Sequence, residues 1–212
     1  MTVIEFFGPK GGQGVTVTAC STALLLAKSG PTVIIDLGGD VPATLGIAQP
    51  YGPGMTDWPG SGPRASTLTV AAADNLRVLP QGAVVEPEGM FRRLLIALDQ
   101  LVDEQFHVVI DHGDGRRPLN THVDATLIVI RPCYLALRRT VMSTAQCSGA
   151  VVIREPGRAL TTRDVEAALG VPALVELDID PAVARCVDAG LLAARLPRTM
   201  IGLSHLFAFG GV

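Results

Sequence analysis

A glycine-rich loop near the N-terminus carries residue types that bind phosphate. Residues 8–16 read GPKGGQGVT and lie between an apolar run and a stretch rich in Ala and Leu. Glycine lets backbone N–H groups turn inward, and the N-terminus of a following helix adds a partial positive charge, so such a loop cradles phosphate oxygens. The general pattern is G-x-x-x-x-G-K-[ST]; Gly14 and Thr16 fit it, whereas Pro9 stands at the position of the first glycine, one residue after Gly8. Val15 stands where the pattern has the lysine that contacts the β- and γ-phosphates, whereas Thr16 keeps the hydroxyl.

Two aspartates at the ends of other apolar runs are candidates to act beside this loop. Asp36 ends the run TVIID, and Asp111 ends the run HVVID. Magnesium prefers oxygen ligands, so Thr16 and Asp111 are the expected contacts for a magnesium ion beside bound phosphates. The alternative is that both aspartates only end strands and cap the turns that follow them.

Strands and helices that alternate along the chain must position these residues. Short apolar runs predict strands at 2–7, 32–36, 76–79, 107–111, 125–131, 149–154 and 171–177. Helical patterns predict helices at 15–29, 87–105, 135–147, 161–169 and 181–192. The apolar tail 199–209 is expected to be helical and to pack in the core or at a dimer contact.

The strands are continuous apolar runs and not alternating ones, which is typical of a parallel sheet covered on both sides. We therefore predict a single-domain α/β fold over residues 1–212, with a mainly parallel sheet and helices on both faces. Ligands bind at the carboxyl edge of the strands in such sheets, where the glycine loop, Asp36, Asp111 and Arg154 all fall.

Residues 38–64 interrupt this alternation with many Gly and Pro residues. They are expected to form a long, mobile surface excursion. Tyr51, Met55 and Trp58 lie within it, and exposed aromatic or large apolar side chains there would suggest a partner site.

The loop resembles the deviant phosphate loop of the ParA/MinD family, the partition and septum-positioning ATPases. That family reads K-G-G-x-G-K-[ST], and this chain reads KGGQGVT from Lys10 to Thr16. By this resemblance, Lys10 is the family's signature lysine, which reaches across a dimer to the partner's nucleotide, and Thr16 is the magnesium-contacting hydroxyl. Asp36 resembles the carboxylate that helps to activate water, although the family continues D-x-D and Gly38 stands at the second position here. Asp111 matches the acid of the Walker B motif.

The resemblance covers nearly the whole chain and implies a P-loop NTPase fold with ATP and Mg²⁺ as cofactors. Later stretches such as DATLIVIRPCYLALRRT and VPALVELDIDPAVARCVDAG also resemble the family. The implied roles fall into three groups. The residues implied in catalysis are Lys10, Asp36 and Asp111, and those implied in magnesium binding are Thr16 and Asp111. The residues implied in nucleotide binding are Gly11, Gly12, Gln13, Gly14, Val15 and Thr16, with Arg154 and Pro181 near the adenine.

Val15 changes the functional expectation. The missing lysine supplies a point charge against phosphate oxygens and stabilises charge in the transition state, and valine does neither. We therefore expect a ParA/MinD-like partition or positioning protein with a degenerate ATP site. It would act in the cytoplasm as a homodimeric scaffold or adaptor for a protein partner, with weak nucleotide binding and little or no ATP hydrolysis.

Two alternatives remain open at this stage. One is an active ParA-like ATPase that cycles between a monomer and an ATP-bound, DNA-binding dimer, in DNA partition or in the localisation of a pilus or secretion machine. The other is a plain interaction module that uses residues 38–64.

Composition argues against several other classes. A net charge of −3 and an aromatic content of 4% argue against coating nucleic acid by bulk charge or by stacking. Arginines such as Arg138 and Arg139 make nonspecific DNA a candidate partner, but the acids between the arginines favour ordinary solvated surface. The sequence contains no C-x-x-C pair, so it indicates neither a zinc site nor a redox site. It contains no run of about 18 apolar residues, so we expect no membrane span.

Overall fold

A single mainly parallel sheet forms the centre of the molecule. The computed structural model describes residues 1–83, 89–114, 118–143 and 145–207. In chain order, the strands are β1 (Val3–Gly8), β2 (Thr32–Asp36), β3 (Val70–Ala73), β4 (Leu76–Leu79), β5 (His107–Asp114), β6 (Ala125–Ile130), β7 (Gly149–Arg154) and β8 (Ala173–Asp178). Their order across the sheet is β3-β4-β2-β5-β1-β6-β7-β8, and only β3 runs antiparallel to its neighbour.

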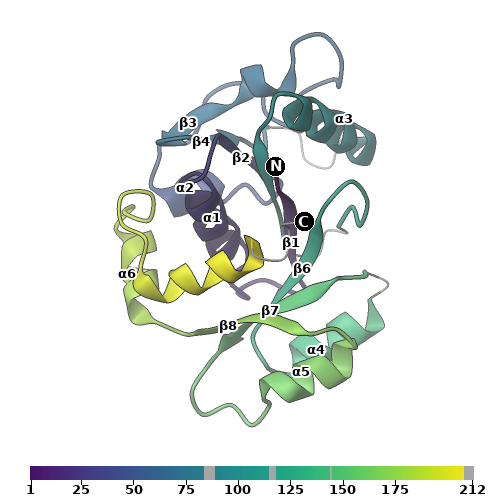
Figure 1. The fold of residues 1–212 in the computed structure, drawn as a ribbon, viewed down its shortest axis with the longest axis vertical. Helices are drawn as coiled ribbons and strands as arrows, with labels where there is room; N and C mark the ends of the chain where they lie inside the picture. Colours follow the sequence, from purple (N-terminus) through teal and green to yellow (C-terminus); the bar gives the residue numbers. More distant parts are fainter. Residues whose placement is uncertain (84–88, 115–117, 144, 208–212) are drawn as a thin grey trace.

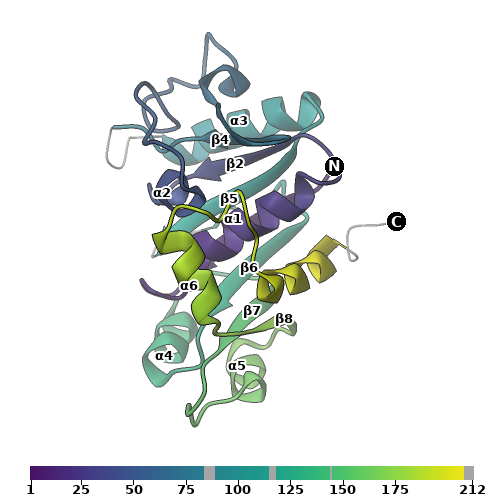
Figure 2. The ribbon, with the colours of Figure 1, turned by 90° about the vertical axis from the view of Figure 1, so that its left-hand side faces the viewer.

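Helices cover both faces of this sheet, as Figures 1 and 2 show. One face carries α1 (Val15–Leu26), α2 (Val41–Leu45), α6 (Pro181–Asp188) and the 3-10 helix η2 (Arg198–Phe207). The other face carries α3 (Met90–Asp103), α4 (Tyr134–Met142), α5 (Thr162–Leu169) and the short 3-10 helix η1 (Ala65–Leu68). The predicted α/β fold class is therefore confirmed.

Strand β1 lies at the centre of the sheet, and its residues alternate between the two faces because strand side chains have a period of two. Ile4 and Phe6 pack in the core under α1, whereas Val3 and Phe7 pack on the opposite face. All of β1 is buried. The loop that leaves β1 therefore begins at a buried strand in the middle of the sheet.

Several predicted boundaries are wrong by a few residues. Helix α1 ends at Leu26 and not at residue 29, and α4 ends at Met142. The predicted start of α3 at residues 87–88 lies outside the described residues, as do residue 144 and the end of the tail beyond residue 207. The sequence prediction also missed β3, a short edge strand of half-exposed small residues that has little hydrophobic pattern.

The predicted excursion at residues 38–64 is only partly a surface loop. It contains the helix α2, and Met55 and Trp58 are 0% and 2% exposed in the core cluster beneath α3. The indole N–H of Trp58 donates a hydrogen bond to the carbonyl of Pro63 at 2.9 Å. The expectation that these two side chains mark an exposed partner site is therefore wrong, because burial of large apolar groups outweighs the loop character of the chain. Tyr51, in contrast, is fully exposed.

The tail packs in the core, as expected. Met200, Leu203 and Leu206 of η2 are buried against the cluster that contains α1 and β8. None of the helices in the described part of the chain is long and apolar enough to cross a membrane.

Candidate functional site

The glycine loop joins β1 to α1 at the carboxyl edge of the sheet and forms one wall of a cavity of about 450 Å³. Gly12 and Gly14 have φ values of +75° and +91°, in the left-handed region that favours glycine. Gly14 caps α1 without a side-chain hydrogen bond, so the first N–H groups of the helix have no side-chain partner at this cap. This backbone is shaped to accept an anion.

Val15 occupies the position at which the pattern has a lysine. Its side chain is 6% exposed and packs against the backbone of Gly8. A Cβ atom added to Gly8 would lie only 2.6 Å from the Cγ2 atom of Val15. The residue at the lysine position of the pattern is therefore apolar, packs against the start of the loop and supplies no ammonium group.

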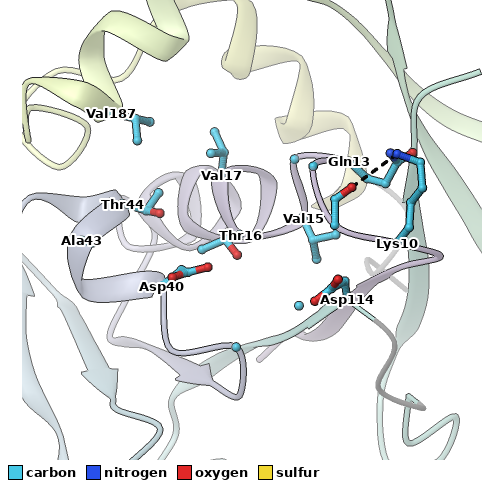
Figure 3. A pocket seen from close by; sticks show the side chains of 15 residues that line it. Lys10, Gln13, Val15, Thr16, Val17, Asp40, Ala43, Thr44, Asp114 and Val187 are labelled. Atoms are coloured by element: carbon cyan, nitrogen blue, oxygen red, sulfur yellow. Dashed lines mark hydrogen bonds between the residues drawn. The ribbon is translucent and has the colours of Figure 1, made fainter.

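Charged side chains at the cavity wall are mostly acidic (Figure 3). Lys10 lines the cavity, and its ammonium group donates to the carbonyl of Gly11 at 3.4 Å. Asp40 and Asp114 line the same cavity, and Asp114 lies so close to the loop that a Cβ added to Gly11 would be 3.1 Å from its Oδ2 atom. Among the described residues, two carboxylates and one ammonium group therefore line this cavity.

Asp36 is held by the backbone of the turn before α2. Its Oδ1 atom accepts a hydrogen bond from the N–H of Gly39 at 2.6 Å, and its Oδ2 atom accepts one from Val41 at 3.2 Å. Burial raises the pKa of Asp36 to about 6; the hydrogen bonds oppose the rise, and the negative charge of Asp40 adds to it. The turn-capping arrangement is present, and the predicted role of Asp36 in activating water stays a prediction.

Asp111 lies beside Asp36, because these two residues are paired in the register of β5 and β2. Its side chain is 0% exposed, and its Oδ1 atom accepts a hydrogen bond from the N–H of Gly113 at 3.0 Å. Burial raises the pKa of Asp111 to about 7; hydrogen bonds from Gly113 and the Thr16 hydroxyl oppose the rise, whereas Asp36 adds to it. In the described part of the chain, its Oδ2 atom has no hydrogen-bond partner.

A second cavity of about 470 Å³ adjoins the first and shares Gln13, Gly14, Val17 and Val187 with it. Pro181, predicted to lie near adenine, lines this second cavity. Its other walls are mainly apolar and include Ile153, Leu177, Val183 and Met200.

Arg131 also lines the second cavity, and the sequence reasoning missed it. Its backbone N–H donates to the side-chain oxygen of Gln13 at 2.9 Å, so Gln13 turns toward β6. The Nε atom of Arg131 is buried and has no partner in the described residues. A signal was present in the sequence, since Arg131 directly follows a buried strand whose carboxyl end reaches the same edge as the loop.

Arg154, predicted to lie near adenine, lines neither of these cavities. Its guanidinium group pairs with Asp178 at 2.7 Å and with Glu176 at 3.4 Å. The structure therefore brings Pro181 to the loop but leaves the Arg154 side chain in surface ion pairs on the outer strands.

A buried polar network on the opposite face of the sheet was also missed. Glu5 is 0% exposed, and its carboxylate contacts Nε2 of His112 at 2.8 Å and accepts hydrogen bonds from the N–H groups of Leu119 (2.8 Å) and Asn120 (2.9 Å). The hydroxyl of Thr126 donates to the same carboxylate at 2.5 Å. Burial raises the pKa of Glu5, but the hydrogen bonds and His112 outweigh burial and leave that pKa lowered. A glutamate inside the apolar run TVIEFF was the available signal.

The residues at the loop fit a magnesium–triphosphate group only in part. Thr16 and the unpartnered oxygen of Asp111 suit a magnesium contact, but no group of three His, Cys, Asp or Glu side chains in the described residues could hold a metal ion by itself. The phosphates would have to supply the remaining ligands, and they would lie against Val15 and beside Asp40 and Asp114. Carboxylates close to phosphate oxygens repel them.

Comparison with solved structures shows the fold of this chain. A ParA family ATPase from Chlorobium tepidum is 17% identical over 99% of this chain and 98% of its own, with a TM-score of 0.76. The cell division protein MinD from Aquifex aeolicus is 16% identical over 100% and 98% of the two chains, also with a TM-score of 0.76. The septum site-determining protein MinD from Pyrococcus horikoshii, solved with Mg-ADP, is 18% identical over 97% and 93%, with a TM-score of 0.69.

No protein-family model and no curated protein matches the sequence. The chain has the fold of the ParA and MinD ATPases over its whole length, as the loop motif led us to expect. At this level of identity the similarity establishes the fold and leaves activity to be argued from the site.

Proposed function

We propose that this chain is a ParA/MinD-like partition or positioning protein with a degenerate ATP site. It acts as a homodimeric scaffold or adaptor in the cytoplasm, binds a protein partner, and hydrolyses ATP weakly or not at all. The fold supports the general role, and the packing of Val15 against Gly8 supports the loss of ATP chemistry.

The observation that carries the proposal is the set of charges around the cradle. In this fold, phosphoryl transfer depends on cations that stabilise charge on the phosphate oxygens. Lys10 and Arg131 are the cationic side chains among the described residues that line the two cavities, and Lys10 bonds to its own loop. The backbone still offers N–H groups, so it supports weak nucleotide binding at most.

The test compares the wild-type protein with Val15→Lys, which restores the missing ammonium group. We expect the wild type to release no phosphate above background and to bind Mg-ATP weakly, and Val15→Lys to bind it about tenfold to a hundredfold more tightly, because charge-assisted hydrogen bonds contribute about 1.5–3 kcal/mol each. Calorimetric titration and a phosphate-release assay measure these quantities. Steady turnover by the wild type that Lys10→Ala abolishes would contradict the proposal.

A dimer independent of nucleotide is the second part of the proposal. Light scattering with and without Mg-ATP measures the oligomeric state, and we expect a dimer in both conditions. A monomer that becomes a dimer only with Mg-ATP would favour the active ATPase instead.

The active ATPase is retained as a second candidate because Thr16 remains beside Asp111 and the glycine loop keeps its left-handed turns. This candidate cycles between a monomer and an ATP-bound dimer on DNA or at a pilus or secretion machine. Salt-sensitive DNA binding by the ATP-bound form would favour DNA partition, since phosphate contacts weaken steeply with salt.

A further inference from the structure

Helix α4 has an outer face that is largely apolar. Four of its large apolar side chains are exposed: Tyr134 (74%), Leu135 (45%), Val141 (62%) and Met142 (73%). The described part of the chain exposes ten large apolar side chains, so four of the ten lie on this nine-residue helix. Exposed apolar side chains are ordinary when they are scattered, but a patch of them is typical of a site that another surface covers.

The packing of α4 on the sheet does not use these four side chains. The inner side of the helix contributes Ala136 and Thr140, which are buried, and Leu137, which is half-buried against the cluster formed with β6, β7 and α5. A surface helix normally combines such an inner stripe with a polar outer face. The apolar outer side chains of α4 therefore have no role in the core of this chain.

Two arginines lie within the same outer face. Tyr134, Arg138 and Met142 are four residues apart and form one row along the helix, and Leu135 and Arg139 form the next row. Both arginines are exposed, and no ion pair between described residues involves either of them. Tyr, Met and Arg are the residue types that are enriched where proteins bind one another. We call the six exposed side chains, these five and Val141, the α4 face.

The neighbouring helix α5 does not neutralise these arginines. It packs beside α4 (Figure 1), and its two acidic residues have other partners. Asp164 accepts hydrogen bonds from the N–H and the hydroxyl of Thr161, both at 2.7 Å, and Glu166 accepts one from the N–H of Ala173 at 2.9 Å. The α4 face itself contains no acid, so its two charges are both positive.

The place of the arginines decides between possible occupants of the α4 face. A second copy related by a two-fold axis would bring this face against itself, and its arginines would repel their equivalents. DNA would offer phosphates to the arginines but no apolar surface to the four other side chains. A lipid surface that took up Tyr134 and Met142 would draw the charge of Arg138, between them, toward the apolar layer. A protein segment with both apolar side chains and carboxylates suits every part of the face.

We propose that the α4 face docks a partner protein through a segment that carries apolar side chains flanked by Asp or Glu. The carboxylates meet Arg138 and Arg139, and the apolar side chains cover Tyr134, Leu135 and Met142. The proposal rests on the proposed function, because it assigns a surface and a chemistry to the protein partner of the scaffold or adaptor.

The first experiment uses a fluorescein-labelled helical peptide with the repeat Leu-Glu-Glu-Leu-Leu-Glu-Glu as the acidic probe. The control peptide has lysine in place of every glutamate, and fluorescence anisotropy measures both dissociation constants. We expect the acidic peptide to bind about tenfold more tightly than the basic one, and to bind less tightly as salt rises from about 0.05 M to about 0.5 M. Equal affinity for the two peptides would overturn the proposal.

The second experiment changes the α4 face in two independent ways. The double variant Tyr134→Ser/Met142→Ser removes apolar surface, and the double variant Arg138→Glu/Arg139→Glu reverses the charge. We expect each to weaken binding of the acidic peptide by about tenfold, and the charge reversal to improve binding of the basic peptide. Far-UV circular dichroism checks that each variant is folded, and either one tests the proposal if the other does not fold.

Helix α3 supplies the matched controls for these variants. Phe91 is 54% exposed and Arg92 is exposed, so Phe91→Ser and Arg92→Glu make the same kinds of change on a different helix. We expect both to bind the acidic peptide as the wild type does. Folded α4 variants that bind it no more weakly than these controls would refute the proposal.

The other occupants of the α4 face are tested with the same variants. Light scattering would detect a dimer that Tyr134→Ser/Met142→Ser dissociates, which would assign the face to a second copy. Sedimentation with phosphatidylcholine–phosphatidylserine vesicles, or anisotropy with a labelled DNA duplex, would detect binding that Arg138→Glu/Arg139→Glu abolishes. Any of these results would overturn the proposal, and we expect none of them.

Failure of this proposal can be told apart from failure of the proposed function. No residue of the α4 face lines either cavity at the glycine loop. ATP turnover by the wild type would contradict only the degenerate ATP site. Acidic-peptide binding that the α4 variants leave unchanged would contradict only the docking role of the α4 face.

Discussion

Asp36 and Asp111 lie side by side at the carboxyl ends of β2 and β5, and burial raises the pKa of each carboxyl group, to about 6 and about 7. An arrangement of this kind stores unfavourable charge interactions that a ligand can relieve. The hydrogen bonds to Asp36 show that one of the pair is already committed to the turn before α2. Asp111 is therefore the member of the pair that has an unsatisfied oxygen to offer.

The raised pKa of Asp111 predicts how stability depends on pH. Between the unfolded value of 3.8 and the folded value of about 7, the folded chain holds a proton that the unfolded chain releases, so the free energy of unfolding falls as pH rises through this range. Asp111→Asn removes part of this decline. We expect its free energy of unfolding to exceed that of the wild type by about 1–3 kcal/mol at pH 8 and to differ little from it at pH 4. Urea unfolding at several pH values measures the difference.

Asp114→Asn is the control for this prediction, since Asp114 is exposed at the mouth of the same cavity. We expect its stability to follow the wild type within about 0.5 kcal/mol at each pH. The explanation fails if the stability of Asp111→Asn runs parallel to that of the wild type from pH 4 to pH 8.

At the scale of elements, β1 and β5 carry polar groups to both faces of the sheet. Asp111 faces the loop on one side, and the next residue, His112, contacts Glu5 on the other. Glu5 also holds the backbone of Leu119 and Asn120, which lie beyond the end of β5. The buried network therefore fixes the path of the chain after the strand that presents Asp111.

Glu5→Gln is expected to destabilise the fold, because it removes the charge that His112, Thr126 and two backbone N–H groups share. We expect the free energy of unfolding to fall by about 2–4 kcal/mol at pH 7. The pKa of Glu5 is lowered in the folded chain, so its contribution is present above pH 4.5 and is lost as pH falls through the folded value. Urea unfolding at pH 7 and pH 3 measures the loss, which should shrink in acid.

Glu104→Gln provides a matched control, since Glu104 pairs with Arg64 at the surface. Exposed pairs contribute about 0–1 kcal/mol, so this variant should stay close to the wild type. A Glu5→Gln protein as stable as Glu104→Gln would mean that the buried network contributes little.

At the scale of the whole molecule, the excursion at residues 38–64 is joined to the core. Trp58 and Met55 pack with side chains of α3, β2 and β5 in one cluster, and η2 closes the opposite face over α1. The cavity beside the glycine loop is lined by residues of the loop, α2 and α6, which lie far apart in the sequence.

Trp58 is the single tryptophan of the chain and reports this packing directly. Because its side chain is 2% exposed, we expect acrylamide to quench its fluorescence much more slowly than that of free tryptophan. Its fluorescence change on urea unfolding should also coincide with the loss of far-UV circular dichroism, as in a two-state transition. Rapid quenching in the native protein, or an earlier fluorescence transition, would show a mobile excursion instead.

The sequence alone determined the fold class, the central strands and the loop with its missing lysine. These features depend on local patterns: continuous apolar runs predict buried parallel strands, and glycine spacing predicts the cradle. Fold similarity to ParA and MinD agrees with that interpretation.

Only the tertiary structure decided which charges meet at the loop. Asp114 lies close to Gly11, the backbone of Arg131 contacts Gln13, and Glu5 pairs with His112. These contacts join segments up to 118 residues apart in the sequence. Trp58 is buried although it lies in a Gly- and Pro-rich segment. Burial and electrostatic environment are properties of the packed chain, so a residue's local pattern cannot reveal whether its charge has a partner.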